Sequence, residues 1–440
     1  MKKVILTGVA LLASAYLFAQ SNNSDIQQTG IRNDADVNQN GTANKSLVTQ
    51  NSNITSSILQ ILRKNEAVVD QDGEDNESDI LQNGNRHFSS VTQDGEGNNA
   101  VVKIGQAGVN NSQNETDIDQ DGEGNSATQL IEGNGSDENY LEADQDGDNN
   151  TSLQTVVGNN SDDNESYVEQ DGNNNNATST QEGDDNYSDI SQDGNNNVAS
   201  AGQDGDDNDS DIDQDGNRNE ARATQTGDDN DSDIDQDGNR NEAYVEQIGE
   251  DNDSDIDQSS NDNYANVYQN GENNDSDITQ DGLLGGNNTA NVTQNGDDNE
   301  SLINQYGNGL VGNDATVNQT GDDNFSQIGQ IGAANEATVD QTGDENHSEI
   351  SQAGVGNNAD VDQSGNLNES YITQSGNIIP FLGNNAIVSQ NGDGHISTID
   401  QNGSLNYANV LQTGLSNISV VDQNGSGNVA NVVQTGGMLP

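Results

Sequence analysis

Amide, small and apolar side chains alternate with acidic ones along nearly the whole chain. In the stretch that ends at Gly216, every second residue belongs to a constant set: Asn208, Ser210, Ile212, Gln214 and Gly216. The residues between them are mostly aspartate. Because successive side chains of an extended strand point to opposite faces, this alternation predicts a β-strand with a constant inner face and a variable, acidic outer face.

The same pattern, N-x-[SA]-x-[IVA]-x-Q-x-G, returns every eleven residues (225 − 214 = 11). Two residues, such as Asn217 and Arg218, separate each glycine from the next asparagine, and Gly, Asn and Asp favour tight corners. Strands with Ser in the small position alternate with strands with Ala, so the same type returns at every second repeat, as at Ser188 and Ser210. The pattern therefore predicts that each pair of strands forms one coil and that similar coils stack on one another as a solenoid.

The predicted fold is all-β, a β-solenoid of stacked two-strand coils of the cross-β type seen in amyloid. The repeat predicts about 22 residues per coil and roughly 18 coils, a stack on the order of 85 Å long. Stacked Gln and Asn amides can bond to one another, which offsets the cost of burying them. The residues expected to form these interior ladders are Gln203, Gln214, Gln225, Gln236, Gln247, Gln258, Asn208, Asn219, Asn230, Ser210, Ala221, Ile212, Gly216 and Gly227.

Three segments are expected along the chain. Residues 1–19 combine a basic start with a short apolar run, which predicts a secretory signal peptide cleaved after Ala19, with Ala15 as the alternative site. Residues 20–436 hold the repeats, and residues 437–440 form a short tail. Within the repeats, residues 52–62 break the pattern and are interpreted as a locally distorted coil.

Insertions fall only at the predicted corners. One set follows strands of the Ser type, and the other follows the alternate strands, so the two sets are expected at opposite edges of the stack. The first set is 283–287, 308–312 and 377–383, and the second is 107–113, 134–138 and 159–163. Three strands carry Ile104, Ile131 or Val156 in place of Gln, and in two of them Gln has moved to the neighbouring inward position, at Gln129 and Gln154.

Composition alone points to a disordered chain, with 28% hydrophobic residues and a net charge of −66. The periodicity outweighs composition, because a disordered chain has no need of a fixed inner face. Eleven basic residues against 77 acidic ones argue against nucleic acid as a partner. The absence of cysteine excludes disulfides and thiolate metal sites.

The segment Gln214-x-Gly216-x-x-Asn219-x-Ala221-x-x-x-Gln225 resembles the repeat of the curlin family, Q-x-G-x-x-N-x-A-x-x-x-Q. Similar segments recur from Gln28 to Gln434. The resemblance implies an extracellular subunit of a curli-like functional amyloid fibre of the biofilm matrix, with a role in adhesion. It also implies export through an outer-membrane pore, a surface nucleator subunit as partner, and head-to-tail stacking of subunits into a homopolymer.

The chain departs from the family pattern in three respects. Asn occupies the position six residues before Gln where the family usually has Ser, and the chain is longer and more acidic than usual. The family also carries a targeting segment before the first repeat, whereas only Gln20 and Ser21 separate the predicted cleavage site from Asn22. The signal that the secretion machinery would recognise is therefore left open.

Two other classes of function stay open at this point, a secreted acidic calcium-binding repeat protein and an adhesin solenoid that remains monomeric. The run Asp211-x-Asp213-x-Asp215-Gly216 resembles the start of a calcium loop, but the twelfth position holds Arg222 where an EF-hand needs Glu. Divalent cations bound non-specifically along the stacked carboxylates are the expected form of metal binding. An ice-binding solenoid would favour Thr-rich outer rows, whereas the outer face here is mostly acidic, which argues against that class.

The sequence predicts no enzyme and no cofactor, because the carboxylates are spread along the stack without a focal cluster. His87 and His395 occupy the Asn position and are expected to replace Asn in its ladder. His347 falls on the outer face and is expected to be solvated.

Overall fold

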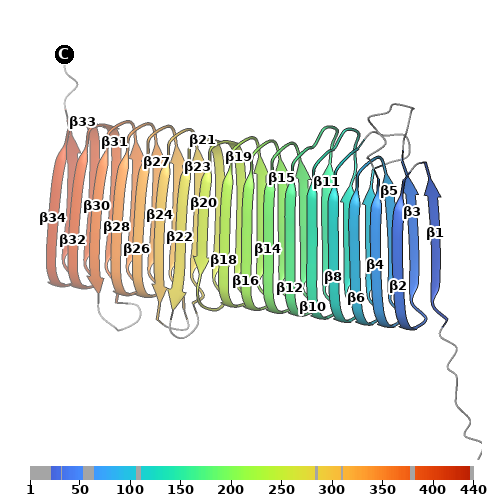
Figure 1. The fold of residues 1–440 in the computed structure, drawn as a ribbon. Helices are drawn as coiled ribbons and strands as arrows, with labels where there is room; N and C mark the ends of the chain where they lie inside the picture. The colour runs from blue at the N-terminus through green and yellow to red at the C-terminus, as the bar shows by residue number, and fades with distance from the viewer. Residues whose placement is uncertain are drawn as a thin grey trace, which may run out of the picture.

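The computed structural model describes residues 21–30, 32–52, 64–105, 111–282, 286–308, 311–376 and 382–436. These residues form 35 β-strands and no helix, which confirms the predicted all-β solenoid. The strands lie side by side in one elongated stack, with β1 at one end and β35 at the other (Figure 1). None of the described segments is a helix that could cross a membrane.

The strands divide into two sheets that face each other across the coil. The 18 odd-numbered strands form the odd sheet. They are β1 (Asn23–Thr29), β3 (Lys45–Asn51), β5 (Glu77–Asn83), β7 (Asn99–Ile104), β9 (Ser126–Ile131), β11 (Thr151–Val157), β13 (Asn176–Glu182), β15 (Val198–Asp204), β17 (Glu220–Thr226), β19 (Glu242–Glu250), β21 (Tyr264–Glu272), β23 (Thr289–Asn295), β25 (Asp314–Thr320), β27 (Glu336–Thr342), β29 (Asn358–Ser364), β31 (Asn385–Asp393), β33 (Tyr407–Leu415) and β35 (Val429–Thr435).

The 17 even-numbered strands form the even sheet. They are β2 (Asp34–Thr42), β4 (Glu66–Glu74), β6 (Phe88–Glu96), β8 (Glu115–Glu123), β10 (Tyr140–Asp148), β12 (Glu165–Asn173), β14 (Tyr187–Asn195), β16 (Asp209–Asn217), β18 (Asp231–Asn239), β20 (Asp253–Gln258), β22 (Asp275–Gly282), β24 (Glu300–Gly307), β26 (Phe325–Ala333), β28 (His347–Val355), β30 (Glu369–Gly376), β32 (Ile396–Ser404) and β34 (Ile418–Ser426).

Neighbouring strands within each sheet pair in parallel and in register. In the even sheet, Asp209 pairs with Asp231 and Gln214 pairs with Gln236, so each residue meets its counterpart two repeats further along the chain. The offset is larger where a corner carries extra residues, as between Thr151 and Asn176. The predicted repeat of about 22 residues per turn is therefore confirmed, and the stack has about 18 turns.

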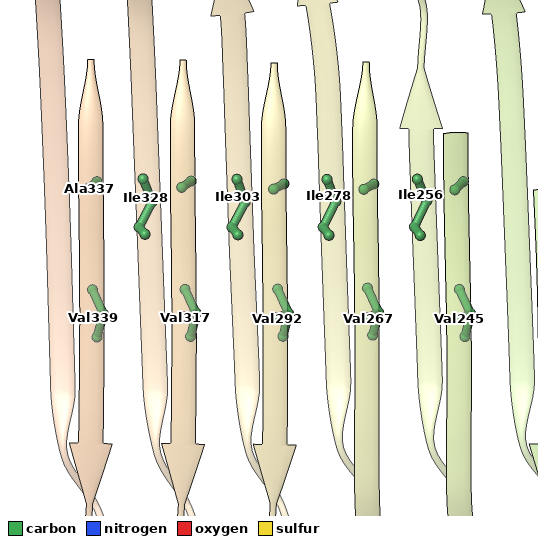
Figure 2. Packing of buried hydrophobic residues seen from close by; sticks show 14 of the residues in the cluster. Val245, Ile256, Val267, Ile278, Val292, Ile303, Val317, Ile328, Ala337 and Val339 are labelled. Atoms are coloured by element: carbon green, nitrogen blue, oxygen red, sulfur yellow. The ribbon is translucent and has the colours of Figure 1, made fainter. Parts of the chain in front are cut away.

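The core is a narrow double row of apolar side chains between the two sheets. From β20 to β33, Ile of the even strands and Ala and Val of the odd strands are almost wholly buried. Figure 2 shows Ile328 at the level of Ala337, with Val339 at a different level along the strand. Each Ile therefore packs beside a small residue of the opposite sheet, which keeps the two layers close.

The insertions lie at opposite edges of the stack, as the sequence predicts. Odd strands point upward and even strands downward in Figure 1, so 134–138, after β9, lie at the upper edge and the corner after β22 lies at the lower edge. The expectation for residues 52–62 is different. These residues fall almost entirely outside the described ones, but β2 pairs directly with β4 (Asp34 with Glu66). β2 and β4 are therefore neighbours in the even sheet, and the described residues form 35 strands.

Candidate functional site

Glutamine side chains form a hydrogen-bonded row inside each sheet, unbroken in the even sheet and interrupted at β7, β9 and β11 in the odd sheet. In the even sheet, Gln214 Nε2 donates to Gln236 Oε1 at 2.8 Å and Gln236 Nε2 donates to Gln258 Oε1 at 2.8 Å. In the odd sheet, Gln203 donates to Gln225 and Gln225 to Gln247, both at 3.1 Å. All of these side chains are buried. Each amide therefore finds its donor and acceptor partners one coil away.

The same glutamines also tie the two sheets together. Gln225 Nε2 donates to the backbone oxygen of Asp209 at 2.6 Å and to that of Asn230 at 2.9 Å. Gln214 Nε2 donates across the coil to the backbone oxygen of Val198 at 3.2 Å. Both N–H groups of a buried amide are thus used, which removes most of the penalty for burying it.

Asparagine side chains close the corners in a second row. Asn219 Nδ2 donates to the backbone oxygen of Gly238 at 3.1 Å, and its backbone N–H donates to Asn197 Oδ1 at 3.0 Å. In the odd-to-even corners, Asn230 Nδ2 donates to Asn208 Oδ1 at 2.9 Å. The asparagines therefore satisfy backbone groups that a corner would leave without partners.

Glycine holds the corners by its backbone. Gly216 and Gly227, which the alternation assigned to the inner face, lie half-buried at the corners with φ of 121° and 117°. A Cβ atom at Gly216 would lie 1.8 Å from the backbone oxygen of Gly238 in the next coil. Both the left-handed conformation and the close stacking of coils therefore require glycine.

Ser210, Ile212 and Ala221 lie fully inside the stack, where the sequence placed them. The Ile and Ala rows supply the apolar contact between the sheets. The hydroxyls of Ser210 and Ser232 have no hydrogen-bond partner among the described residues. The Ser row therefore carries a cost that the Gln row does not.

Substitutions within the rows keep the interior chemistry. Gln129, displaced by one inward position, donates to Gln154 Oε1 at 2.9 Å. His395 takes both roles of an asparagine, since its Nδ1 accepts from the backbone N–H of Asn417 at 3.2 Å and its Nε2 lies 3.3 Å from the backbone oxygen of Asn391. His87 is equally buried, and burial lowers its pKa to about 4.

The outer face of the even sheet, here the even face, carries rows of carboxylates in register. The densest part is the aspartate block on β16, β18, β20 and β22. Its members are Asp209, Asp211, Asp213, Asp215, Asp231, Asp233, Asp235, Asp237, Asp253, Asp255, Asp257, Asp275, Asp277 and Asp281. No even strand contains Lys or Arg. The outer face of the odd sheet is richer in Thr and Asn and carries fewer acids.

The pKa values of several carboxyls in the aspartate block are raised, and those of Asp211 and Asp255 are among them. Partial burial is the largest cause for Asp211, and the neighbouring carboxylates of Asp189 and Asp233 add to it, which together raise the pKa of Asp211 to about 6. The same causes raise the pKa of Asp255 to about 6. Partial burial is therefore the first cause of the raised pKa values, and repulsion between the carboxylates is the second.

Aromatic side chains form short rows on the even face. Tyr140, Tyr167 and Tyr187 follow one another with ring centroids 5.4 and 5.6 Å apart. His347 stacks on Phe325 at 4.7 Å, and its Nε2 lies 2.9 Å from Glu349 Oε1. His347 is thus on the outer face as expected, but it is half-buried between neighbours where simple solvation was expected.

The described carboxylates do not converge on a metal site. A shallow groove of about 410 Å³ on the even face is lined by carboxylates that include Asp119, Asp144 and Glu169. Among the described residues, no group of three His, Cys, Asp or Glu side chains has the spacing to hold a metal ion. The hypothesis of a specific calcium loop therefore gains no support from the geometry.

The chain matches the family model of the curlin associated repeat. The family model matches seven segments: residues 63–95, 161–194, 183–216, 205–238, 227–259, 285–321 and 321–354. No curated protein matches the chain. The matched segments lie in the stretches that build the ladders described above.

Proposed function

The chain belongs to the curlin repeat family, and from this premise we propose that it is a structural subunit of an extracellular, curli-like amyloid fibre. In this proposal the subunit acts without catalysis, and its main partner is a second copy of itself. Export past the cell envelope rests on the predicted signal peptide in residues 1–19. The fibre would serve the matrix and adhesion, as the family implies.

The direction of the glutamine ladders carries the proposal. At the first coil, Gln28 donates to Gln50 at 2.8 Å and Gln39 donates to Gln71 at 2.7 Å. At the last coil, Gln423 and Gln434 accept in the same way from the coil before. Every link points the same way, so the last coil offers amide N–H groups and the first coil offers amide oxygens.

The bonds from backbone N–H groups to side chains of the asparagine rows run in the opposite direction, from each coil to the coil before it. They too leave complementary groups at the two ends of the array. The backbone N–H of Asn44 donates to Asn22 Oδ1 at 3.2 Å, and that of Asn428 donates to Asn406 Oδ1 at 3.1 Å. Asn428 Oδ1 and the backbone N–H of Asn22 therefore face outward at opposite ends of the described array. Two different, complementary ends join head to tail without closing, which produces a filament.

The distribution of charge supports contact at the ends. Between Asp206 and Asp257 acidic residues crowd almost every strand, whereas Asp422 is the only acidic residue from Gln401 onward. Like charges along the middle oppose association of unassembled chains and keep them soluble. The lightly charged coils near Ile26 and Val432 are then the surfaces that meet.

Electron microscopy of residues 20–440, purified and left at neutral pH, tests this function. We expect unbranched fibres that grow faster when preformed fibres are added. A chain that stays monomeric under these conditions, with or without calcium, would instead favour a monomeric solenoid.

A pair of proline substitutions tests the last strand as the joining edge. Tyr407 N–H donates to Asn428 O on the following strand, so alternate residues such as Asn431 and Val433 direct their N–H groups away from β33. Asn431→Pro with Val433→Pro removes these donors from the open edge and leaves the bonds to β33 in place. We expect elongation to slow at least tenfold, whereas Asn431→Ala with Val433→Ala should elongate as the parent does.

A further inference from the structure

The described array begins and ends on the same sheet. It contains 35 strands, and both β1 and β35 belong to the odd sheet. Along the stack, the position that follows β35 is therefore on the even sheet, next to β34. A second copy whose β1 continues the array without a gap must place that strand on the even sheet of the first copy.

The strands are of two types, and the first strands are the reverse of the later ones. From β20 to β32 every even strand carries Ser and then Ile on its inner face, and from β19 to β35 every odd strand carries Ala and then Val. At the start of the array the assignment is exchanged. The odd strand β1 carries Ser24 and Ile26, and the even strand β2 carries Ala35 and Val37.

The two types fit each other across the core because each level combines a large and a small residue. Figure 2 shows Ile328 of a Ser/Ile strand level with Ala337 of an Ala/Val strand. The residue order is reversed between the two sheets, so Val339 falls at the level of Ser in the opposite strand. A close-packed core favours this pairing, since two large residues at one level would clash and two small ones would leave a void.

We propose that a second copy of the chain docks with its β1 on β34 and its β2 on β35, so that neighbouring subunits differ by half a turn about the long axis of the stack. This inference rests on the proposed fibre function and adds the geometry of the joint. Ser24 then lies on Ser419, and Ala35 lies on Ala430. Ile26 packs at the level of Ala430, as Ile328 does beside Ala337.

After a half turn, each strand of the second copy runs parallel to the strand that it meets. Odd and even strands point in opposite directions across the coil (Figure 1), and a half turn exchanges the sheets and reverses the strands together. β1 of the second copy is then parallel to β34, and Gln423 can donate to Gln28 of that copy. Translation without rotation would place β1 on β35 and leave an even-sheet position empty between β34 and the next β2.

The joint has a consequence for the surface of the fibre. The aspartate block lies on the even face, so a half turn puts it on alternating sides of successive subunits. The fibre repeat would then be two subunits, about 170 Å at roughly 4.8 Å per coil. Translation alone would give one strongly acidic side along the whole fibre.

Cysteine cross-linking tests the joint, because the chain has no cysteine of its own. Half-turn docking places Asp25 beside Val420 and Asp36 beside Asn431, at the spacing of neighbouring strands, which suits a disulfide. Translation places Asp25 beside Asn431 instead. The two test variants are Asp25→Cys with Val420→Cys and Asp36→Cys with Asn431→Cys, and the matched control is Asp25→Cys with Asn431→Cys.

We expect oxidised fibres of both test variants to run as ladders of covalent oligomers on non-reducing gels, and those of the control to run mainly as monomers. Cross-linking of the control in preference to the test pairs would overturn half-turn docking, and so would fibres in which neither test pair cross-links. Failure of the parent chain to form fibres would count against the proposed function instead. Electron microscopy of each variant separates these outcomes.

Discussion

Two rows of identical residues run side by side through β16, β18 and β20, one inside the stack and one outside. Inside, Gln214 donates to Gln236 at 2.8 Å, and the pair is fully buried. Outside, Asp213 pairs in register with Asp235 on the even face, and like charge raises the pKa of both carboxyls after the larger effect of partial burial. The two rows differ by one position along the strand.

The difference shows that stacking identical side chains stabilises a solenoid only when the group complements itself. An amide carries donors and an acceptor, so each copy satisfies the next along the whole row. A carboxylate has only acceptors when ionised, so stacked copies repel and depend on water, cations or protons for relief. The chain places the self-complementary row inside and the repelling row in solvent.

Exchanging an inner glutamine, here one of the odd-sheet row, and an outer aspartate for lysine gives the largest expected contrast. Gln225→Lys buries a charge without a counter-ion and breaks the links to Gln203 and Gln247, so we expect a loss of several kcal/mol in the free energy of unfolding. Asp213→Lys places a cation among carboxylates in solvent and should change that free energy by less than about 1 kcal/mol. Denaturant titration of both variants, followed by circular dichroism, measures the contrast.

Assembly offers a second measure of the same pair. We expect Gln225→Lys to slow fibre formation strongly and Asp213→Lys to leave it unchanged or faster. Equal tolerance of the two substitutions in both measurements would contradict the assignment of the rows to inside and outside.

Most of the fold is predictable from the sequence because one strand pattern sets the face, the corner and the period at once. The alternation around Gln214 and the eleven-residue spacing predict the strand and the coil. The Ser and Ala types, at Ser210 and Ala221, predict which strands pair. Each feature is local, repeated many times and tied to a fixed geometry of the backbone.

The remainder depends on distances between coils that the pattern does not contain. The alternation put Gly216 on the inner face, whereas its role comes from a positive φ and the oxygen of Gly238 close by. The pairing of Asp34 with Glu66, which makes β2 and β4 neighbours in the even sheet, is also a contact between coils that the pattern does not contain. The described strands number 35, and half-turn docking follows from this odd number.

Acid should reduce the repulsion within the outer aspartate row. The difference between the inner and outer rows in their contribution to stability should then become smaller. The pKa of Asp211, Asp231, Asp235 and Asp255 is raised from 3.8 to about 6, chiefly by partial burial and then by neighbouring aspartates. An aspartate with a raised pKa holds its proton more tightly when folded. Its contribution to stability is therefore fully present below the unfolded value near 4 and is lost as the pH rises through about 6.

We expect the denaturation midpoint of the chain to rise as the pH is lowered from about 7 to about 5, and fibre formation to speed up with it. Each carboxyl should contribute below about 1 kcal/mol, because these side chains are more than a third exposed and are screened. High salt or millimolar calcium at neutral pH should give part of the same gain. A midpoint that is the same at both pH values, with and without calcium, would sink this prediction.

His87 acts against this trend and needs a control. Burial lowers its pKa from 6.5 to about 4, so the folded state resists its protonation and loses stability as the pH falls below 6.5. His87→Asn keeps the role of the asparagine row and removes the titration. We expect the gain in acid to be larger in this variant than in the parent.

The Ser row gives the smallest and sharpest comparison, because it lies inside like the Gln row but has no self-complementary partner. The hydroxyl of Ser232 is fully buried and without a hydrogen-bond partner among the described residues. Ser166, in the same row, accepts a bond from Gln154 Nε2 at 3.1 Å. The two serines therefore differ in whether a neighbouring glutamine reaches the hydroxyl.

Ser232→Ala removes a buried hydroxyl that gains nothing from the fold, so we expect the free energy of unfolding to rise by about 1 kcal/mol. Ser166→Ala removes a hydroxyl that does accept a bond, while Gln154 keeps the backbone oxygens of Glu142 and Ser166 as acceptors, so the free energy should fall by less than about 1 kcal/mol. Thermal unfolding of the two variants under identical conditions measures this difference in sign. If both substitutions destabilise equally, the serines stabilise the stack through packing. Whether an inner side chain can hydrogen-bond to its own copies would then not decide how much its row contributes to the free energy of unfolding.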